Sequence, residues 1–239
     1  MKTAMIICAG FGTRMREYTK NTPKPMLPVC GKPILEYTVR HLEMLGIKDL
    51  IINLHYLPDS IKSYFEDGKK FGVKITYSYE EKPLGTAGAV KKVENLLKEK
   101  KEFLLLYGDV FCDEDYNGLF EFHGSKTGAV GTIILHRKKK SNSVVEIDAD
   151  NRVTRFIERP ETEVRDKKQE WVNSGLYCFS SNVLGLIPAN IYCDFPRDIF
   201  PQLVRTGVLF GYPLKGYRCC IDTPESYMLL QETIGKGGV

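Results

Sequence analysis

The chain has 239 residues, of which 43% are hydrophobic and 27% are charged, and its formal net charge is +4. That length can bury a sizeable core and predicts a single domain over residues 1–239, while the mild charge, spread along the chain, argues against nucleic-acid binding. No apolar run has the roughly 20 residues that cross a bilayer and no signal-peptide cleavage pattern precedes the first strand, so we expect a cytoplasmic protein without a membrane partner.

The first segment, residues 4–8 (AMIIC), is continuously apolar and predicts a short strand buried on both faces of a parallel sheet. Gly10 and Gly12 follow at once and let the backbone turn tightly, so that its amide groups can approach a phosphate. Arg14 adds a planar cation with several donors for phosphate oxygens. Taken alone, this glycine pair also fits an ordinary strand-to-helix turn.

Residues 22–28 (TPKPMLP) place three prolines around Lys24 and predict an extended loop of restricted freedom. Two familiar phosphate motifs do not match this region. A dinucleotide fingerprint would have glycine where Met15 stands, and the Gly-Lys-Ser/Thr of a Walker loop is missing. The glycine turn and Lys24 therefore predict a phosphate site of another kind.

Two segments together, AGFGTRM (residues 9–15) and TPKPMLPVCGKPILEY (residues 22–37), resemble the signature of the sugar-1-phosphate nucleotidylyltransferases. The resemblance implies a Rossmann-like three-layer α/β sandwich with a mainly parallel mixed sheet. It also implies that an NTP and a sugar 1-phosphate react to give an NDP-sugar and pyrophosphate. Under this reading the nucleotide phosphates bind at Ala9, Gly10, Gly12 and Thr13, and the catalytic cations are Arg14 and Lys24.

Helices and strands then alternate along the chain. Apolar residues at helical spacing predict helices over residues 34–45, ending at Gly46, and over residues 59–71. Residues 49–54 and 73–78 predict strands. This alternation is typical of a mainly parallel sheet with right-handed crossovers.

The next loop contains Pro83, Gly85 and Gly88 and opens into a helix predicted to begin near Thr86. The first amide groups of that helix would be free to face an anion or a base edge. PLGTAGAV resembles the family's nucleotide-base loop, most closely the mannose and heptose guanylyltransferase version. The resemblance thus assigns Pro83, Gly85, Thr86 and Gly88 to nucleotide binding.

Two aspartates are candidate ligands for Mg²⁺. The apolar strand 103–107 runs into Asp109, and open α/β sheets place ligand chemistry at such strand ends. The segment LLLYGDVF of this chain resembles the family's strand whose aspartate holds Mg²⁺. Many members have a second aspartate where Cys220 stands here, whereas Asp222 resembles the arrangement in the cytidylyltransferase branch, so we take Asp222 as the second ligand. A thiolate at Cys220 would be a poor ligand for Mg²⁺.

The second half of the chain carries the predicted sugar side of the site. FIERPE resembles a family segment in which Glu158 would accept hydrogen bonds from sugar hydroxyls and Arg159, replacing a lysine, would hold the sugar phosphate. Asn173 and Gly175 match the family's sugar-binding turn. The family often has a glycine near residues 142–143, where this chain has Asn-Ser.

The remaining elements are mostly strands. We predict strands over residues 129–135, 144–147, 152–156 and 171–179, a hairpin tip at 137–140, a charged loop at 163–170, a structural helix over 195–203, and a terminal hairpin formed by 208–214 and 215–221. A last helix precedes the terminal GKGGV, and we expect no C-terminal β-helix domain of the kind some relatives carry.

The seven cysteines include no Cys-x-x-Cys pair, which argues against a disulfide framework and a structural zinc site and for reduced thiols. The four histidines show no metal-ligand spacing, so each is expected to be structural.

The substrates are left open by the sequence. PLGTAGAV favours GTP with a mannose- or heptose-type 1-phosphate, while YGD and Asp-Thr favour cytosine. Alternatives are a CTP- or dTTP/UTP-dependent transferase acting on glucose 1-phosphate or a non-sugar phosphate, and a non-catalytic nucleotide-sugar-binding subunit. A homo-oligomer is compatible with each of these alternatives.

Overall fold

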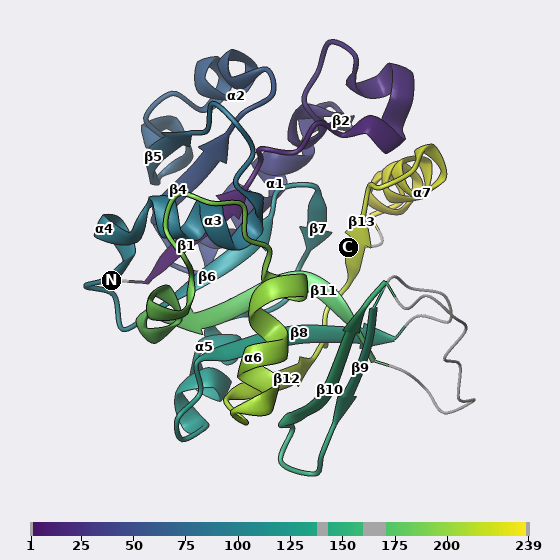
Figure 1. The fold of residues 1–239 in the computed structure, drawn as a ribbon. Coiled ribbons are helices and arrows are strands. Elements are labelled where there is room, and N and C mark those ends of the chain that lie inside the picture. Colours follow the sequence, from purple (N-terminus) through teal and green to yellow (C-terminus); the bar gives the residue numbers. More distant parts are fainter. Residues whose placement is uncertain (1, 138–142, 160–170, 238–239) are drawn as a thin grey trace. The chain divides into compact units, whose positions relative to one another are not determined.

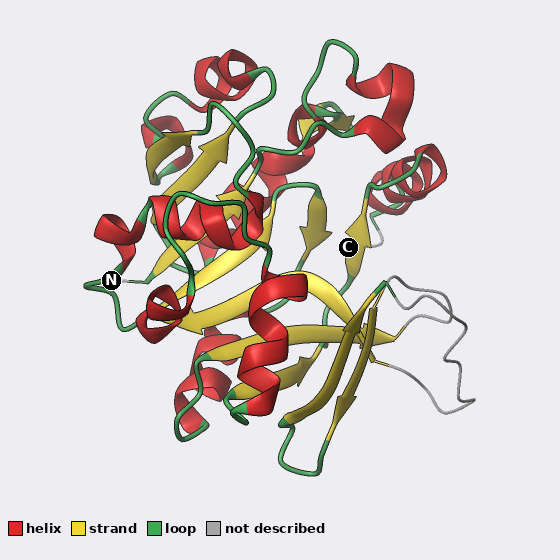
Figure 2. Cartoon of the chain, in the orientation of Figure 1, coloured by secondary structure: helices red, strands yellow, loops and turns green. Residues whose placement is uncertain are grey.

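The computed structural model describes residues 2–137, 143–159 and 171–237. The chain divides into two compact units, the first comprising residues 1–83, 105–116 and 215–239 and the second residues 84–104 and 117–214. Figure 1 labels the elements and Figure 2 distinguishes helices from strands. The single-domain assignment stays a prediction, and most of the tip at 137–140 and all of the loop at 163–170 lie outside the described residues.

The first unit is built on parallel strands. β1 (Thr3–Ile7) pairs with β4 (Asp49–Leu54), which pairs with β5 (Lys74–Tyr79), and the end of β6 (Glu102–Tyr107) lies beside β1. β4 is buried along its last five residues, as expected for a strand covered on both faces. The crossovers run through α1 (Ile34–Met44) and α2 (Pro58–Phe65). The predicted strand–helix alternation is confirmed here.

Several short elements complete this unit. They are 3-10 helices Thr13–Thr19, Lys24–Met26 and Lys69–Phe71, strands β2 (Pro28–Val29), β3 (Lys32–Pro33), β7 (Val110–Cys112) and β13 (Arg218–Cys220), and helix α7 (Pro224–Gly235). The 3-10 turn Lys24–Met26 corrects the expected extended loop: Pro25 stands at its second position, where a missing N–H costs nothing.

The second predicted helix is shorter than residues 59–71: α2 ends at Phe65, Glu66 leaves the helical region with φ +50°, and the chain then turns at Gly68. Gly68 has φ +87°, and a Cβ there would lie 2.8 Å from the carbonyl oxygen of Val73. A side chain does not fit this left-handed turn, so the helix cannot continue through it. The chain forms a separate 3-10 turn, Lys69–Phe71, before entering β5.

The second unit contains a mixed sheet. β11 (Trp171–Ser180) pairs antiparallel with β8 (Gly131–Arg137) and β9 (Ser143–Ile147), and β9 pairs antiparallel with β10 (Val153–Glu158) (Figure 1). Its helices are α3 (Gly85–Lys92), α4 (Glu94–Leu97), α5 (Tyr116–Ser125), the 3-10 helix Ser181–Leu186, the π-helical turn Phe195–Ile199 and α6 (Phe200–Arg205). The two units together confirm the predicted α/β class with a mixed sheet.

The predicted terminal hairpin is wrong. β12 (Leu209–Pro213) pairs in parallel with β8 in the second unit, whereas β13 pairs antiparallel with β7 in the first. The Asp113 carboxylate accepts a hydrogen bond from the amide of Tyr217, which holds the start of β13 against β7. Alternating apolar residues indicate strands, but they do not identify the strands with which they pair.

Aromatic rings fill the core of the second unit. Phe179 stacks on Phe195 with ring centroids 4.5 Å apart, and Tyr177 meets Phe200 edge-on at 5.3 Å. All four side chains are buried. The predicted structural helix at 195–203 thus covers one face of β11. No helix among the described residues has the length and apolar character needed to cross a bilayer.

Phe179→Ala should destabilise the protein by about 3–5 kcal/mol, because the neighbouring rings cannot fill the cavity left behind. Urea unfolding followed by circular dichroism measures the change. Leu186→Ala, which truncates a side chain that is 41% exposed, is the control and should cost well under half as much. Equal losses in the two variants would contradict the assigned core.

Candidate active site

The glycine turn after β1 lines a pocket in the first unit. Gly12 has φ +67°, and its carbonyl oxygen accepts hydrogen bonds from the Thr19 hydroxyl and the Met15 amide, both at 2.9 Å. A Cβ at Gly10 would meet no atom within 4 Å, so the backbone is open to a ligand there. The pocket is lined by Ile7, Cys8, Gly10, Gly12, Thr13, Arg14, Lys24, Pro25, Tyr107 and Asp109.

Five of the residues predicted from the sequence therefore share this pocket with Asp109. Ala9 is 7% exposed and Pro83 is exposed, and neither lines it. Ile7, Cys8, Pro25 and Tyr107 line it without having been predicted. They are apolar or flank the predicted residues, so no sequence signal distinguishes them from core positions.

Lys24 lies between two carboxylates. Its Nζ is 2.5 Å from Asp109 Oδ2 and 2.5 Å from Asp222 Oδ1, while Arg14 reaches the same Asp222 oxygen at 3.0 Å. Lys24 is 7% exposed, which makes this the buried end of the pocket, and the Arg14 side chain is 62% exposed. The structure thus brings together the four charged residues that the sequence assigned to catalysis and metal binding.

Neighbouring charges stabilise the ionised forms of two of these residues, Lys24 and Asp222. Burial alone would lower the pKa of Lys24, but the negative charges of Asp109 and Asp222 raise it above its usual value. Burial alone would raise the pKa of Asp222, but the positive charges of Lys24 and Arg14 lower it. At neutral pH the lysine is therefore an ammonium ion and Asp222 a carboxylate.

The donor atoms of Asp109, Cys220 and Asp222 lie within 4.8 Å of one another and can hold a divalent ion. Burial, then the charges of both aspartates, raise the pKa of Cys220 well above its usual value, so its sulfur remains a neutral thiol. Carboxylate oxygens are the hard donors that Mg²⁺ prefers, and a thiol sulfur is not such a donor. Asp222 stands directly before Thr223, whose side chain caps α7.

In the second unit, the loop before α3 packs against residues 191–193. Gly85 has φ +75°, and a Cβ there would lie 2.4 Å from the Cys193 carbonyl oxygen. That oxygen accepts hydrogen bonds from the amides of Ala87 and Gly88, both at 3.0 Å. These two amides are therefore engaged, which differs from the expectation that they are free to face a ligand.

The Thr86 hydroxyl contacts Asp194, to which it donates a 3.0 Å hydrogen bond, and it accepts another from the amide of Phe195. Asp194 also acts on Glu158: burial, then the negative charge of Asp194, raise the pKa of Glu158 to about 7, with Arg159 opposing. Arg159 is exposed, with φ +51°. Asp194 was not singled out in the sequence, because nothing local relates it to Thr86 or Glu158.

Asn173 shapes a bulge in β11. Its amide nitrogen donates to the Tyr177 hydroxyl at 2.9 Å, and its amide oxygen accepts from the Gly175 N–H at 3.0 Å. The register between β11 and β8 shifts between Asn173 and Tyr177, and Gly175 has φ +75°. In this structure the asparagine amide is engaged in holding the turn that carries both residues.

A family model described as nucleotidyl transferase matches residues 3–234 of the chain. The chain belongs to the nucleotidyl transferase family. It is 36% identical over 233 residues to a Xenopus laevis protein named mannose-1-phosphate guanyltransferase beta-B. The aligned region covers 94% of the chain and 62% of that protein. It is 35% identical to a UTP–glucose-1-phosphate uridylyltransferase of Synechocystis, covering 87% of the chain and 56% of that protein.

Solved structures agree with this membership. HddC from Yersinia pseudotuberculosis superposes with a TM-score of 0.82 at 28% identity, covering 98% of this chain and 100% of that chain. A second structure of HddC is described as complexed with GMP-PN. The chain spans about three fifths of the length of the curated relatives it matches.

Glu158→Gln should change how the stability of the protein depends on pH. The folded-state pKa of Glu158 is about 7, above the usual 4.5, so folding favours the protonated side chain. The stability that this protonated form contributes is present at low pH and is lost as pH rises through 7. Glutamine cannot ionise. The variant should therefore gain stability relative to the wild type between about pH 5 and pH 8.5.

Denaturant unfolding at about pH 5 and pH 8.5 measures the difference in stability between Glu158→Gln and the wild type. Glu99→Gln, which removes an exposed carboxylate in the same unit, is the matched control and should change stability equally at both. A Glu158→Gln variant that behaves like this control would show that Glu158 titrates at an ordinary pKa.

Proposed function

We propose that the protein transfers a guanylyl group from GTP to a mannose- or heptose-type 1-phosphate and releases pyrophosphate. The observation that carries the proposal is the pairing of the buried Lys24 with both Asp109 and Asp222 beside a glycine-lined pocket. Such an arrangement suits phosphoryl chemistry, in which two anions must approach each other and most of the acceleration comes from positioning and charge neutralisation.

The first unit carries the proposed phosphate and metal roles. The amides of the turn from Gly10 to Thr13, together with Arg14, hold the departing pyrophosphate. Lys24 neutralises charge on the α-phosphate and on the attacking sugar phosphate. The phosphate oxygen of the sugar 1-phosphate is itself the nucleophile. No side-chain nucleophile is needed, because a phosphate monoester is already ionised at neutral pH.

Asp109 and Asp222 are the residues that would hold Mg²⁺, and the ion would supply further positive charge for the phosphate oxygens. The donor atoms of these residues already lie within 4.8 Å of one another, which supports this assignment. Their carboxylates are hard ligands, and the neutral Cys220 thiol leaves the coordination to them.

The second unit carries the proposed specificity roles. Gly85, Thr86 and Gly88, with Pro83 preceding them, shape the segment assigned to base and ribose. Glu158, Arg159, Asn173 and Gly175 are assigned to the sugar phosphate. The carboxylate of Glu158, with a pKa of about 7, can act as a donor when protonated and as an acceptor when ionised.

Names of relatives support guanine and mannose, since the Xenopus protein is named a mannose-1-phosphate guanyltransferase and HddC is described in complex with GMP-PN. The test crosses GTP, CTP, UTP, dTTP and ATP with mannose, heptose and glucose 1-phosphates and follows pyrophosphate release with Mg²⁺. We expect GTP with mannose or heptose 1-phosphate to give the highest kcat/KM. A higher value for UTP with glucose 1-phosphate would reassign the substrates, and nucleotide binding without turnover for every pair would indicate a regulatory subunit.

A further inference from the structure

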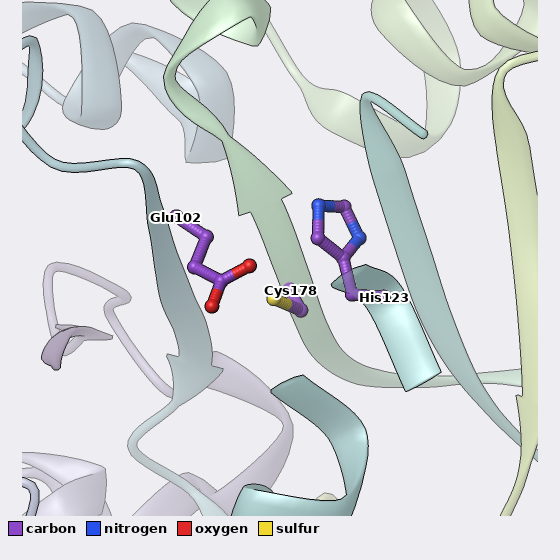
Figure 3. A group of neighbouring side chains, drawn as sticks. All are labelled: Glu102, His123 and Cys178. Atoms are coloured by element: carbon purple, nitrogen blue, oxygen red, sulfur yellow. The ribbon is translucent and has the colours of Figure 1, made fainter. Parts of the chain in front are cut away.

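Three side chains of ligand type meet in the second unit, in residues that the proposed reaction does not use. They are Glu102 at the start of β6, His123 on α5 and Cys178 on β11 (Figure 3). One donor atom from each lies within 4.8 Å of the others. His123 is 4% exposed and Cys178 is fully buried, whereas Glu102 is partly exposed.

The pleat of the strands explains why these side chains converge. Phe103 follows Glu102, and Phe179 follows Cys178, and these two rings contact each other with centroids 6.0 Å apart. Successive side chains of a strand point to opposite faces. Glu102 and Cys178 therefore share the other face, where Figure 3 shows the Glu102 carboxylate directed towards Cys178 and His123.

A hydrogen bond fixes the imidazole of His123. Its Nδ1 lies 2.8 Å from the hydroxyl of Thr132, a buried residue of β8 that stands opposite Cys178 in the β11–β8 register. With Nδ1 engaged, Nε2 is the nitrogen left to bind an ion. Histidines that bind metals commonly have such a partner on the other nitrogen, which sets the ring orientation.

The imidazole is also in the correct protonation state. Burial, with a smaller contribution from the positive charge of Lys101, lowers the pKa of His123 to about 4. At neutral pH the ring is therefore uncharged, as a ligand must be. In addition, the hydroxyl of Ser180 is buried without a hydrogen-bond partner, two residues beyond Cys178 on the same face of β11.

We propose that Glu102, His123 and Cys178 bind one Zn²⁺ ion, with Thr132 positioning the histidine. One sulfur, one nitrogen and one oxygen donor form a set typical of zinc and unsuited to Mg²⁺. Binding replaces the thiol proton by the metal and releases that proton to solvent. The ion would fasten β6, α5 and β11 to one another within the second unit, and its role is structural.

Rules based on the spacing of ligands along the sequence do not predict this site. The missing Cys-x-x-Cys pair predicted that structural zinc is absent, but the three proposed ligands are separated by 21 and 55 residues along the chain (123 − 102 and 178 − 123). They meet because the sheet and α5 fold together. The proposal does not depend on the proposed transferase activity.

Cobalt(II) titration of metal-free protein tests the proposal, because Co²⁺ substitutes for Zn²⁺ and absorbs light. We expect one equivalent to bind with tetrahedral d–d bands and a sulfur-to-cobalt charge-transfer band. Cys178→Ala should lose the charge-transfer band. Glu102→Gln should weaken binding at least about tenfold, since a ligand should matter no less than its supporting partner.

Two controls separate this site from other parts of the chain. Glu121→Gln makes the same chemical change at an exposed position of α5 and should bind cobalt like the wild type. Cys220→Ala removes the thiol beside Asp109 and should keep the charge-transfer band. Zinc should raise the melting temperature of both controls and of the wild type, but not that of Cys178→Ala.

Loss of the band in Cys220→Ala with retention in Cys178→Ala would overturn the proposal, as would a wild type that binds cobalt without a sulfur band. Should Cys178→Ala fail to fold, Glu102→Gln decides, because its side chain is partly exposed at the first residue of a strand. A Glu102→Gln variant with wild-type affinity for cobalt would equally refute it.

Discussion

Asp109→Asn should lower kcat by about 10²–10³-fold while the protein remains folded. Asparagine has the same shape as aspartate but lacks the negative charge, so it weakens the hold on Mg²⁺ and leaves Lys24 paired with Asp222 alone. The half-maximal Mg²⁺ concentration should rise in the same variant. Pyrophosphate release at increasing Mg²⁺ measures both effects, and circular dichroism confirms the fold.

Asp115→Asn is the matched control for this substitution. It makes the same change at an exposed position six residues further along the chain and should keep wild-type turnover. A folded Asp109→Asn variant that releases pyrophosphate at the normal rate would remove Asp109 from the metal site and with it the proposed arrangement of charges.

Lys24→Met should affect both turnover and stability. Turnover should fall by about 10²–10³-fold, because an ammonium ion no longer neutralises the reacting phosphates. The free energy of unfolding at neutral pH should fall by about 3 kcal/mol, since a buried ion pair is broken. We expect the lower end of the range for such a change because Arg14 still pairs with Asp222. Asp109 and Asp222 are then left as neighbouring carboxylates that repel each other.

The pH dependence of that loss follows from the pKa shifts. In the wild type the pKa of Lys24 is raised and that of Asp222 is lowered, so their mutual stabilisation persists through neutral pH. It disappears as pH falls through the folded-state pKa of Asp222 or rises through that of Lys24. In Lys24→Met the repulsion fades as Asp222 takes up a proton, so the deficit should shrink at low pH.

Urea unfolding at several pH values, with and without Mg²⁺, measures this. Mg²⁺ should stabilise Lys24→Met more than the wild type, because the ion replaces the missing positive charge. Lys20→Met, at an exposed position nearby, should show neither effect. If the two lysine variants unfold alike at every pH, the contacts of Lys24 with the aspartates contribute nothing to stability.

The sequence predicted those parts of the structure that depend on neighbouring residues. The continuous apolar run before Gly10 predicts β1, and the prolines around Lys24 predict a stiff segment there, because both rest on local steric limits. The grouping of Lys24, Asp109 and Asp222 was predicted through the family resemblance, since nothing local relates residues so far apart. The 3-10 turn at Lys24 was missed because proline at the second position of a turn reads as a break in a helix.

Properties that depend on distant pairing were not predictable. The partners of β12 and β13 are chosen by packing and by contacts such as that of Asp113 with Tyr217, so the expected hairpin was wrong. The same limit applies to Asp194 in the second unit. Its charge raises the pKa of Glu158, and its carboxylate accepts a hydrogen bond from the Thr86 hydroxyl, although both residues are distant in the sequence. The amides of Ala87 and Gly88 were expected to be free for a similar reason: their acceptor lies about one hundred residues later, at Cys193.

The position of Lys24 also bears on how the protein exchanges ions. A lysine that bridges both aspartates occupies, through its own charge, the place where a divalent cation would bind. Metal uptake is then a competition with an internal cation, and the free protein should hold Mg²⁺ weakly. Under the proposed function, phosphates entering the pocket would offer Lys24 a new counterion and so release the aspartates. Ion and nucleotide should therefore bind with positive cooperativity, each raising the affinity of the other by the same factor.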